Sequence, residues 1–291
     1  MFGGAGAGLS GATTATASLT TYVIGGVNAN SVFSGTIADG GAAATALVFN
    51  GPGSLTLTGS NAFSGGTTVN GGTLLINNPV GSGTGAGVVS VNPGATLGGN
   101  GTIGGQVSLA AGATLAPGSN GAGTLTITND LGLNNASILQ FQLGTTSGQV
   151  AVSGDLTLGG TLNLTSTGGF GPGSHPLFTY AGALSIGTLG IGAAPIGYTY
   201  SIDTSTQGQV NLIVSLPQFG GVRAMPGGLV LSGSGGMPGS NYYVLGSTNL
   251  ALPPAGWVRL LTNQFDGGGN FSFTNGYGTN GPQQFYRLQL P

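Results

Sequence analysis

Short runs in residues 1–216 alternate apolar side chains with Thr, Ser or Asn. The clearest of these runs are Ser54–Gly59, Thr73–Asn77, Gly123–Thr128 and Gly154–Leu164. A period of two is typical of a β-strand that buries one face. Asn-Gly pairs between the runs indicate turns. Because no stretch has helical periodicity, we expect an all-β structure with essentially no helix.

The runs also repeat along the chain. The segment "PGATLGGNG" (Pro93–Gly101) returns as "AGATLAPGS" (Ala111–Ser119), and the earlier segment "GGTLLI" (Gly71–Ile76) matches the first part of both. Self-similarity at a period of about 20 residues predicts a solenoid, in which each turn pairs with the turns above and below at about 4.8 Å. About ten turns would fit in residues 1–216, which gives a rod of about 50 Å.

The segment "LTLTGSNAFSGGTTVNGGTLLI" (Leu55–Ile76) resembles the autotransporter-associated β-strand repeat of bacterial surface proteins. The resemblance extends over about residues 33–214 and includes Phe33–Gly41, Gly94–Gly118 and Tyr198–Val214. It implies a right-handed parallel β-helix that is exported and displayed at the bacterial cell surface or outside the cell. The family has no shared catalytic residues to transfer to this sequence.

The pattern changes near "SLPQFGGVRAMPGG" (Ser215–Gly228), and all three Arg and the only Trp lie in this stretch or after it. Five short runs then predict strands: Leu229–Ser232, Tyr242–Gly246, Trp257–Leu261, Phe271–Thr274 and Phe285–Leu290. They indicate a small antiparallel β-sandwich, and the stretch resembles a terminal module of some secreted bacterial repeat proteins.

We therefore expect a β-helix over residues 1–216, a linker over 217–221 and a small β-module over 222–291. In the module, Trp257, Phe271, Phe273 and Tyr286 are the expected core.

Composition narrows the functions that this chain can perform. Among 291 residues there are 63 Gly, three Arg, five Asp and one His, with no Cys. So few cations argue against nucleic-acid binding, which depends on Lys and Arg contacts to phosphate. No apolar run is long enough for a transmembrane helix. The start of the chain, Met1–Thr21, lacks a basic region and a compact apolar core, so we expect no signal peptide there.

Several residues match known chemical motifs, each with a simpler explanation. Gly6–Gly11 and Gly99–Gly104 fit G-x-G-x-x-G, but neither lies in a βαβ unit, so we expect no cofactor. His175 would need Asp203 or Asp155 as a partner for a Ser-His-Asp site, yet a loop His beside Pro is usually a surface residue. One His and scattered Asp do not form a metal-binding set.

Of the rod's four carboxylates, Asp39, Asp130, Asp155 and Asp203, one pair could meet. Asp130 and Asp155 are separated by about one turn of the expected solenoid, so they could stack at about 5 Å, as in retaining glycosidases. The alternative, which we favour, is that both cap turns through backbone hydrogen bonds.

The Thr residues allow a further idea. Outward Thr rows could order water as in ice-binding proteins, although Thr is also simply a good strand residue. Two short Thr-x-Thr rows occur in the sequence, one formed by Thr56 and Thr58 and the other by Thr124, Thr126 and Thr128.

The sequence therefore predicts a non-enzymatic extracellular structural protein with no catalytic, cofactor or metal residues. It would be displayed on the surface or assemble into filaments or a matrix by head-to-tail β-contacts, because a solenoid has open strand edges and this chain has little charge repulsion. Residues 1–32 are the expected donor strand for the next copy. The alternatives are a glycan-binding adhesin, with cell-surface glycans as partners, and a polysaccharide-active β-helix enzyme.

Overall fold

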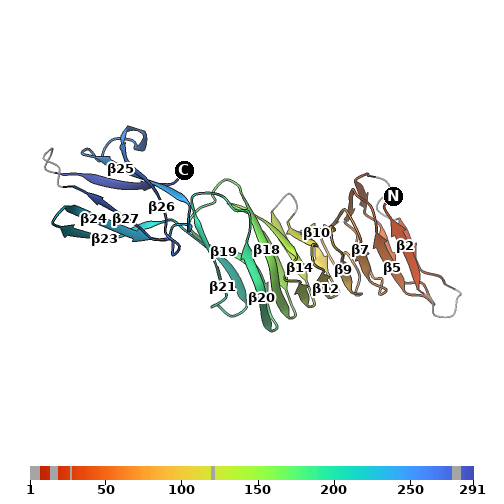
Figure 1. The fold of residues 1–291 in the computed structure, drawn as a ribbon. Helices are drawn as coiled ribbons and strands as arrows, with labels where there is room; N and C mark the ends of the chain where they lie inside the picture. Colours follow the sequence, from red (N-terminus) through yellow and green to blue (C-terminus); the bar gives the residue numbers. More distant parts are fainter. Residues whose placement is uncertain (1–6, 14–18, 27, 119–121, 277–282) are drawn as a thin grey trace. The chain divides into compact units, whose positions relative to one another are not determined.

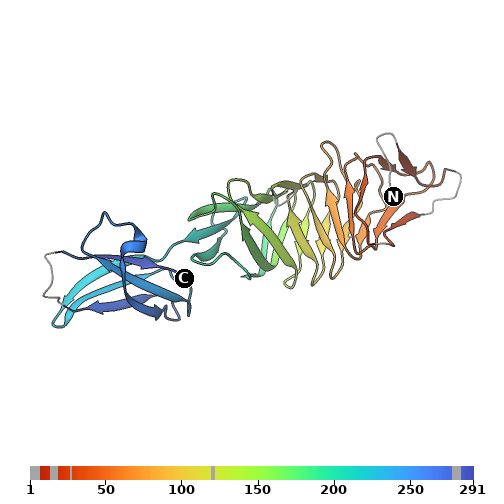
Figure 2. The ribbon, with the colours of Figure 1, turned by 90° about the horizontal axis from the view of Figure 1, so that it is seen from above.

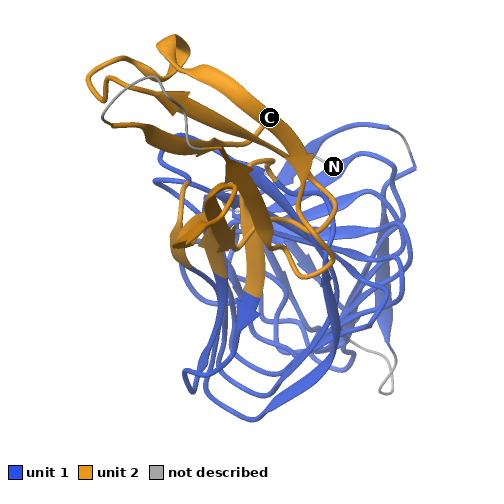
Figure 3. Ribbon diagram, turned by 60° about the vertical axis from the view of Figure 1, so that its left-hand side comes forward, with its two compact units in different colours: residues 1–170, 175–194, 202–212 blue, residues 171–174, 195–201, 213–291 orange. Residues whose placement is uncertain are grey.

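The computed structural model describes residues 7–13, 19–26, 28–118, 122–276 and 283–291. The chain divides into two compact units, coloured separately in Figure 3. Unit 1 comprises residues 1–170, 175–194 and 202–212, and unit 2 comprises residues 171–174, 195–201 and 213–291. The longest segment of unit 2 runs from Ile213 to Pro291.

Unit 1 is a parallel β-helix whose strands lie side by side as successive turns (Figures 1 and 2). Its first face contains β2 (Thr20–Ile24), β5 (Thr45–Phe49), β7 (Thr67–Val69), β9 (Val89–Val91), β12 (Val107–Leu109) and β15 (Leu131–Leu133). Its second face contains β3 (Ser31–Phe33), β6 (Ser54–Leu57), β8 (Thr73–Ile76), β10 (Thr96–Gly99), β13 (Thr114–Pro117) and β16 (Ile138–Leu143). The long strand β18 (Leu156–Ser166) joins both faces, and β20 (Leu184–Ile191) pairs along it.

The third face is less regular. Near the N-terminus β1 (Gly8–Ser10) pairs with β4 (Thr36–Ala38). Further along, a six-stranded sheet forms from β11 (Thr102–Ile103), β14 (Gly123–Ile127), β17 (Gly148–Val152), β19 (Gly173–Tyr180), β22 (Gln209–Ser215) and β21 (Thr199–Asp203).

The strand register confirms the sequence repeats. Thr96 pairs with Thr114 on one side and with Thr73 on the other, and these three residues hold the same place in the three matching segments. The number of turns was overestimated: the first face steps seven times from β2 to β20. Turns differ in length, since one runs only from Val89 to Val107 whereas another runs from Leu156 to Leu184. The rod of unit 1 is accordingly about 34 Å long rather than about 50 Å.

Alternation decides which side chains fill the rod. On the first face one inward row is apolar and buried throughout: Phe49, Val69, Val91, Leu109, Leu133 and Leu158. The neighbouring outward row carries Thr68, Ser90, Ser108, Gly132 and Thr157. A one-residue slip would exchange the two rows, so burial fixes the register.

Buried asparagines connect the turns where the third face lacks strands, between β4 and β11. Asn61 is 5% exposed; its Oδ1 accepts from the Ile37 amide at 2.7 Å and its Nδ2 donates to the Gly83 carbonyl at 2.6 Å. Asn78 is 4% exposed, and its Oδ1 accepts from the Thr102 amide at 3.0 Å. These side chains satisfy backbone groups that a ladder would otherwise satisfy.

A second asparagine row lies at an exposed corner. The Nδ2 of Asn70 donates to the Oδ1 of Asn50, and the Nδ2 of Asn92 donates to the Oδ1 of Asn70, both at 2.6 Å. The three residues occupy the same corner in successive turns, directly after β5, β7 and β9.

Unit 2 contains two three-stranded antiparallel sheets. One has the order β23 (Gln218–Met225), β24 (Gly228–Ser234), β27 (Phe271–Asn275), and the other β26 (Val258–Gln264), β25 (Asn241–Ser247), β28 (Phe285–Gln289). The five expected strands are all present. Strand β23 was not foreseen, and it includes Gln218–Gly221 of the stretch 217–221 that was expected to be a linker.

The core of unit 2 differs from the expected set at Trp257. Phe271 and Phe273 are buried in it and Tyr286 packs against it, as expected, but the cluster is completed by Tyr242 and Phe265. Trp257 is only partly buried and its indole N–H donates to the Leu252 carbonyl beside a single 3-10 turn, Pro254–Gly256. That turn is the only helical element in the described residues, which agrees with the all-β prediction.

Candidate functional site

The described residues within 1–32 form the first turn of the rod, which differs from the expectation that residues 1–32 are a donor strand for the next copy. Within the described part of that segment, β1 pairs with β4, β2 with β5 and β3 with β6. The Tyr22 hydroxyl donates to the Ser10 carbonyl at 2.7 Å and ties β2 to β1. In the described residues no further strand pairs with the outer edges of β1, β2 and β3.

The opposite end of the stack is open as well. β20 pairs with β18, and no described strand continues either helical face beyond it. Ile186 continues the inward apolar row, one step after Leu158, yet it is 62% exposed. An inward-row residue is this exposed because no further turn covers it. Since β20 spans both faces and β2 and β3 begin them, the two ends present the same strand arrangement.

The carboxylates of Asp130 and Asp155 accept hydrogen bonds from backbone amides and do not pair with each other. Oδ1 of Asp130 accepts from the Asp155 amide at 2.8 Å, and Oδ1 of Asp155 accepts from the Ala183 amide at 2.7 Å. Each carboxylate thus caps the next turn, as the turn-cap interpretation predicts. This arrangement confirms that the two residues occupy successive turns but assigns them a structural task.

The other two rod carboxylates also bind backbone amides. Asp39 accepts from the Ser64 hydroxyl at 2.6 Å, the Ser64 amide at 3.0 Å and the Thr45 amide at 2.7 Å. The Ser64 hydroxyl is the main reason why the pKa of Asp39 lies below its ordinary value. Asp203 accepts from the Ser205 amide at 2.9 Å, which lowers the pKa of Asp203 in the same way.

The remaining sequence candidates are distributed along the rod. His175 lies in β19 with its ring 5.4 Å from that of Phe170. Gly99–Gly104 spans the last residue of β10 and the whole of β11, with no helix, whereas Gly6–Gly11 lies partly outside the described residues. No group of three or more His, Cys, Asp or Glu that could hold a metal occurs in the part of the chain that the structure describes.

The Thr residues do not form continuous rows. Thr56 stacks between Val32 and Leu75, and Thr126 stacks between Thr102 and Ala151. A flat Thr-x-Thr surface is therefore interrupted after one or two turns.

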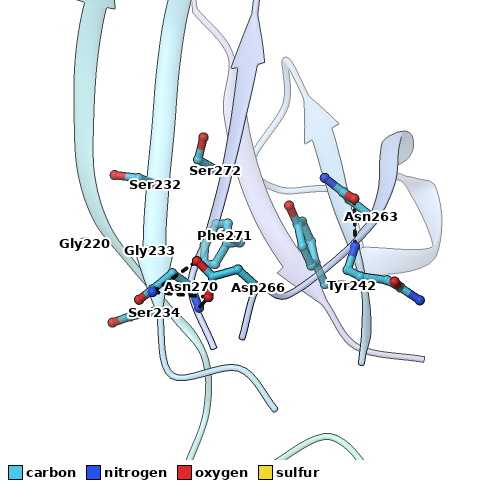
Figure 4. Close-up of a pocket in the computed structure, with 11 residues that line it drawn as sticks. Gly220, Ser232, Gly233, Ser234, Tyr242, Asn263, Asp266, Asn270, Phe271 and Ser272 are labelled. Atoms are coloured by element: carbon cyan, nitrogen blue, oxygen red, sulfur yellow. Dashed lines mark hydrogen bonds between the residues drawn. The ribbon is translucent and has the colours of Figure 1, made fainter. Parts of the chain in front are cut away.

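Unit 2 has a hollow of about 590 Å³ between its two sheets, lined by both polar and apolar groups (Figure 4). The hydroxyl, amide and carboxylate side chains around it are Ser232, Ser234, Tyr242, Asn263, Gln264, Asp266, Asn270 and Ser272. Asp266 accepts from the Asn270 amide and the Gly268 amide, both at 2.8 Å, and these bonds hold the pKa of Asp266 below its ordinary value. An ionised carboxylate with a lowered pKa is poorly suited to act as a general acid.

Tyr242 is the buried member of this hollow. It is fully buried, and its hydroxyl makes no hydrogen bond of good geometry within the described residues. Burial raises the pKa of Tyr242, while the nearby side chain of Asn263 opposes that rise. The hydroxyl therefore stays neutral near pH 7, and its ring packs on Phe265 and Phe271 as part of the core.

Comparison with known proteins agrees with this architecture. Residues 47–76 match the family model of the passenger-associated-transport-repeat. The chain is also 44% identical over 113 residues to the adhesin BmaC autotransporter of Brucella suis biovar 1 (strain 1330), which covers 36% of this chain and 3% of that protein. The chain thus corresponds to only a small part of the length of this relative.

These findings define the class of protein. The chain carries an autotransporter passenger-type β-helix repeat, which confirms the resemblance read from Leu55–Ile76. These matches support a bacterial cell-surface or extracellular location for this chain. No helix in the described residues is both long and apolar enough to cross a membrane.

Proposed function

We propose that this protein is a non-enzymatic structural component that associates end to end through the open ends of its β-helix. The observation that carries the proposal is the exposed inward-row side chain Ile186 on β20, at an end whose strand arrangement matches that of β2 and β3. Adding β2 and β3 of a second copy below β20 would continue both faces as parallel strands. Such a contact pairs free backbone groups and buries apolar surface.

Charge distribution adds a small contribution. Residues 1–216 contain four Asp and no Arg, which gives −4, while residues 222–291 contain three Arg and one Asp, which gives +2. Exposed charges this few are largely screened by salt. A head-to-tail contact is heterologous, so it generates a linear filament unless its rotation closes a ring.

The association can be tested with Ile186→Lys and a matched control, Val88→Lys. Val88 is 51% exposed but lies midway along the rod rather than at its end. A second copy stacked on β20 would bury the new charge of Ile186→Lys without a partner. We expect sedimentation velocity and electron microscopy to show polymers of the wild type and of Val88→Lys, and monomers of Ile186→Lys.

Three results would refute end-to-end association. They are a wild type that stays monomeric at high concentration, an Ile186→Lys variant that polymerises normally, and an equal loss of polymers in both variants. Far-UV circular dichroism would first establish that both variants keep the β-structure of the wild type.

The absence of enzymatic activity is part of the proposal. Asp130 and Asp155 both use one carboxylate oxygen to accept from a backbone amide, which supports a capping role. We expect no turnover of polysaccharides. Glycan cleavage that is lost in Asp130→Asn or Asp155→Asn would contradict this.

We also propose that residues 222–291 form a module separate from the rod of residues 1–216. The separate core of unit 2 around Tyr242 and Phe271 supports it. Expression of residues 213–291 alone should give a cooperatively folding protein, and an unfolded product would contradict the division.

A further inference from the structure

Two of the three cations in this chain lie on one face of unit 2. In the sheet β26-β25-β28, Leu245 pairs with Arg259 on one side and with Arg287 on the other. Tyr242 and Val244 on the same central strand point into the core, so Tyr243 and Leu245 lie on the opposite face, where Leu245 is itself only 4% exposed but the arginines on either side of it are exposed. Both arginines are exposed on this outward face, two strands apart, which places their Cα atoms about 10 Å from each other.

Arg259 is oriented by an aromatic ring. Its guanidinium carbon lies 3.7 Å from the centroid of the Tyr243 ring, which is the geometry of a cation–π contact. Stacking uses the face of the guanidinium and leaves its in-plane N–H groups free to donate. The donors of Arg259 are therefore held in place before any ligand arrives.

No acid neutralises these two arginines. None of the five Asp forms an ion pair with Arg259 or Arg287 in the described residues, and the residues outside those ranges contain no Asp or Glu. Asp266, the single carboxylate of the module, is occupied by Asn270 and Gly268. A solvent-facing pair of arginines with no internal counter-ion is suited to an external anion.

A hollow of about 360 Å³ adjoins Arg287 on unit 2. Its lining mixes apolar and polar groups and includes Tyr198, Leu216, Leu245, Pro254 and Gln289. Apolar surface beside amides and cations suits a ligand with both carbon faces and hydroxyl or acid groups.

We propose that this face of unit 2, formed by Tyr243, Arg259 and Arg287, binds an acidic polysaccharide through the carboxylates of its uronic acid units. Two arginines whose Cα atoms lie about 10 Å apart, one of them held over the Tyr243 ring, can each take a carboxylate of one chain that carries acids at intervals. The Tyr243 hydroxyl and the Gln289 amide lie on the same face as the arginines and suit the hydroxyls of the intervening sugars.

An anionic membrane fits this face less well. Each cation near such a surface contributes about 1 kcal/mol, and stable attachment requires a cluster of several. The whole chain has three arginines and no lysine, and its net charge is −2. The fixed positions of Arg259 and Arg287 therefore favour a ligand with spaced carboxylates over a membrane, whose binding depends on total positive charge.

The test is a calorimetric titration of the full chain with sodium polygalacturonate oligomers at low salt. We expect Arg259→Gln and Arg287→Gln each to weaken binding about tenfold, since each removes a charge-assisted contact. Arg223→Gln is the matched control, because it makes the same charge change on β23 of the other sheet. We expect it to change the affinity less than twofold.

The measurement also distinguishes this inference from end-to-end association, on which it does not rest. All titrations are made in the Ile186→Lys background and repeated with neutral dextran and with phosphatidylglycerol vesicles. The inference is wrong if polygalacturonate does not bind, if dextran binds equally well, if vesicles bind and polygalacturonate does not, or if Arg223→Gln weakens binding as much as the other two variants do.

Discussion

Asn61 offers the sharpest test of how the turns of the β-helix are held together. It is buried, it accepts from the Ile37 amide and it donates to the Gly83 carbonyl, so one side chain connects three successive turns. Ile37 and Gly83 are themselves buried, so Asn61→Ala leaves an amide and a carbonyl away from water without these partners.

The expected cost follows from those two groups. A buried donor or acceptor left unsatisfied costs about 1–3 kcal/mol, so Asn61→Ala should destabilise unit 1 by about 4 kcal/mol. Asn70→Ala is the matched control. It also removes two side-chain hydrogen bonds, to Asn50 and from Asn92, but at an exposed corner where water replaces them. We expect it to cost about 1 kcal/mol.

Equilibrium unfolding in urea, followed by far-UV circular dichroism, measures this difference. The single tryptophan, Trp257, lies in unit 2, so its fluorescence follows that unit separately and should be unchanged in both variants. If Asn61→Ala costs no more than Asn70→Ala, buried asparagines do not replace the missing ladder, and the reasoning fails.

Three further outcomes are expected. The lowered pKa of Asp39, due first to Ser64, means that its stabilising contribution is complete above the ordinary value of 3.8 and is lost as pH falls through the folded-state value. The urea midpoints of wild type and Asp39→Asn should therefore converge at acid pH, and a constant gap would contradict this. Gly85→Ala, at φ 67° and with a new Cβ 1.9 Å from a neighbouring carbonyl oxygen, should lower the urea midpoint by the equivalent of about 2 kcal/mol or more. Gly168→Ala, which meets no atom within 4 Å, should change stability by under about 0.5 kcal/mol, and equal effects of the two would refute the steric argument. Tyr242→Phe removes a buried hydroxyl that makes no hydrogen bond of good geometry, so it should stabilise unit 2 by about 1 kcal/mol in fluorescence-detected unfolding, and a clear loss would show that the hydroxyl is bonded, with Asn263 as the nearest candidate.

The sequence by itself determined the fold class and the local register. The three repeated segments align at Thr73, Thr96 and Thr114, and these are the residues that pair in the stacked turns. The physical reason is that a period of two leaves only one register that keeps each Leu inside, and similar segments stack most easily on one another. The five short runs in unit 2 were found from their apolar and aromatic residues, although only β24, β25 and β27 contain buried side chains.

The roles of the rod carboxylates could also be predicted from the sequence. The separation of Asp130 and Asp155 along the chain placed them in successive turns. Because Asx residues at turns favour backbone hydrogen bonds, a capping role could be predicted for both. The outward face that carries Arg259 and Arg287 could not be predicted from the sequence. The two arginines become neighbours of Leu245 only because β26 and β28, which are far apart in the sequence, both pair with β25.

Tertiary structure alone decided the number of turns, the strand pairing of the described part of residues 1–32 and the composition of the core of unit 2. Parallel turns pair across loops of variable length, so the turn from Leu156 to Leu184 is much longer than the turn from Val89 to Val107, and no local signal counts them. The described part of residues 1–32 joins the first turn because β5 and β6 offer it partners. Tyr242 and Phe265, rather than Trp257, complete the core of unit 2. Burial depends on which residues face one another across two packed sheets, and pairing between distant strands sets this rather than the apolarity of a single residue.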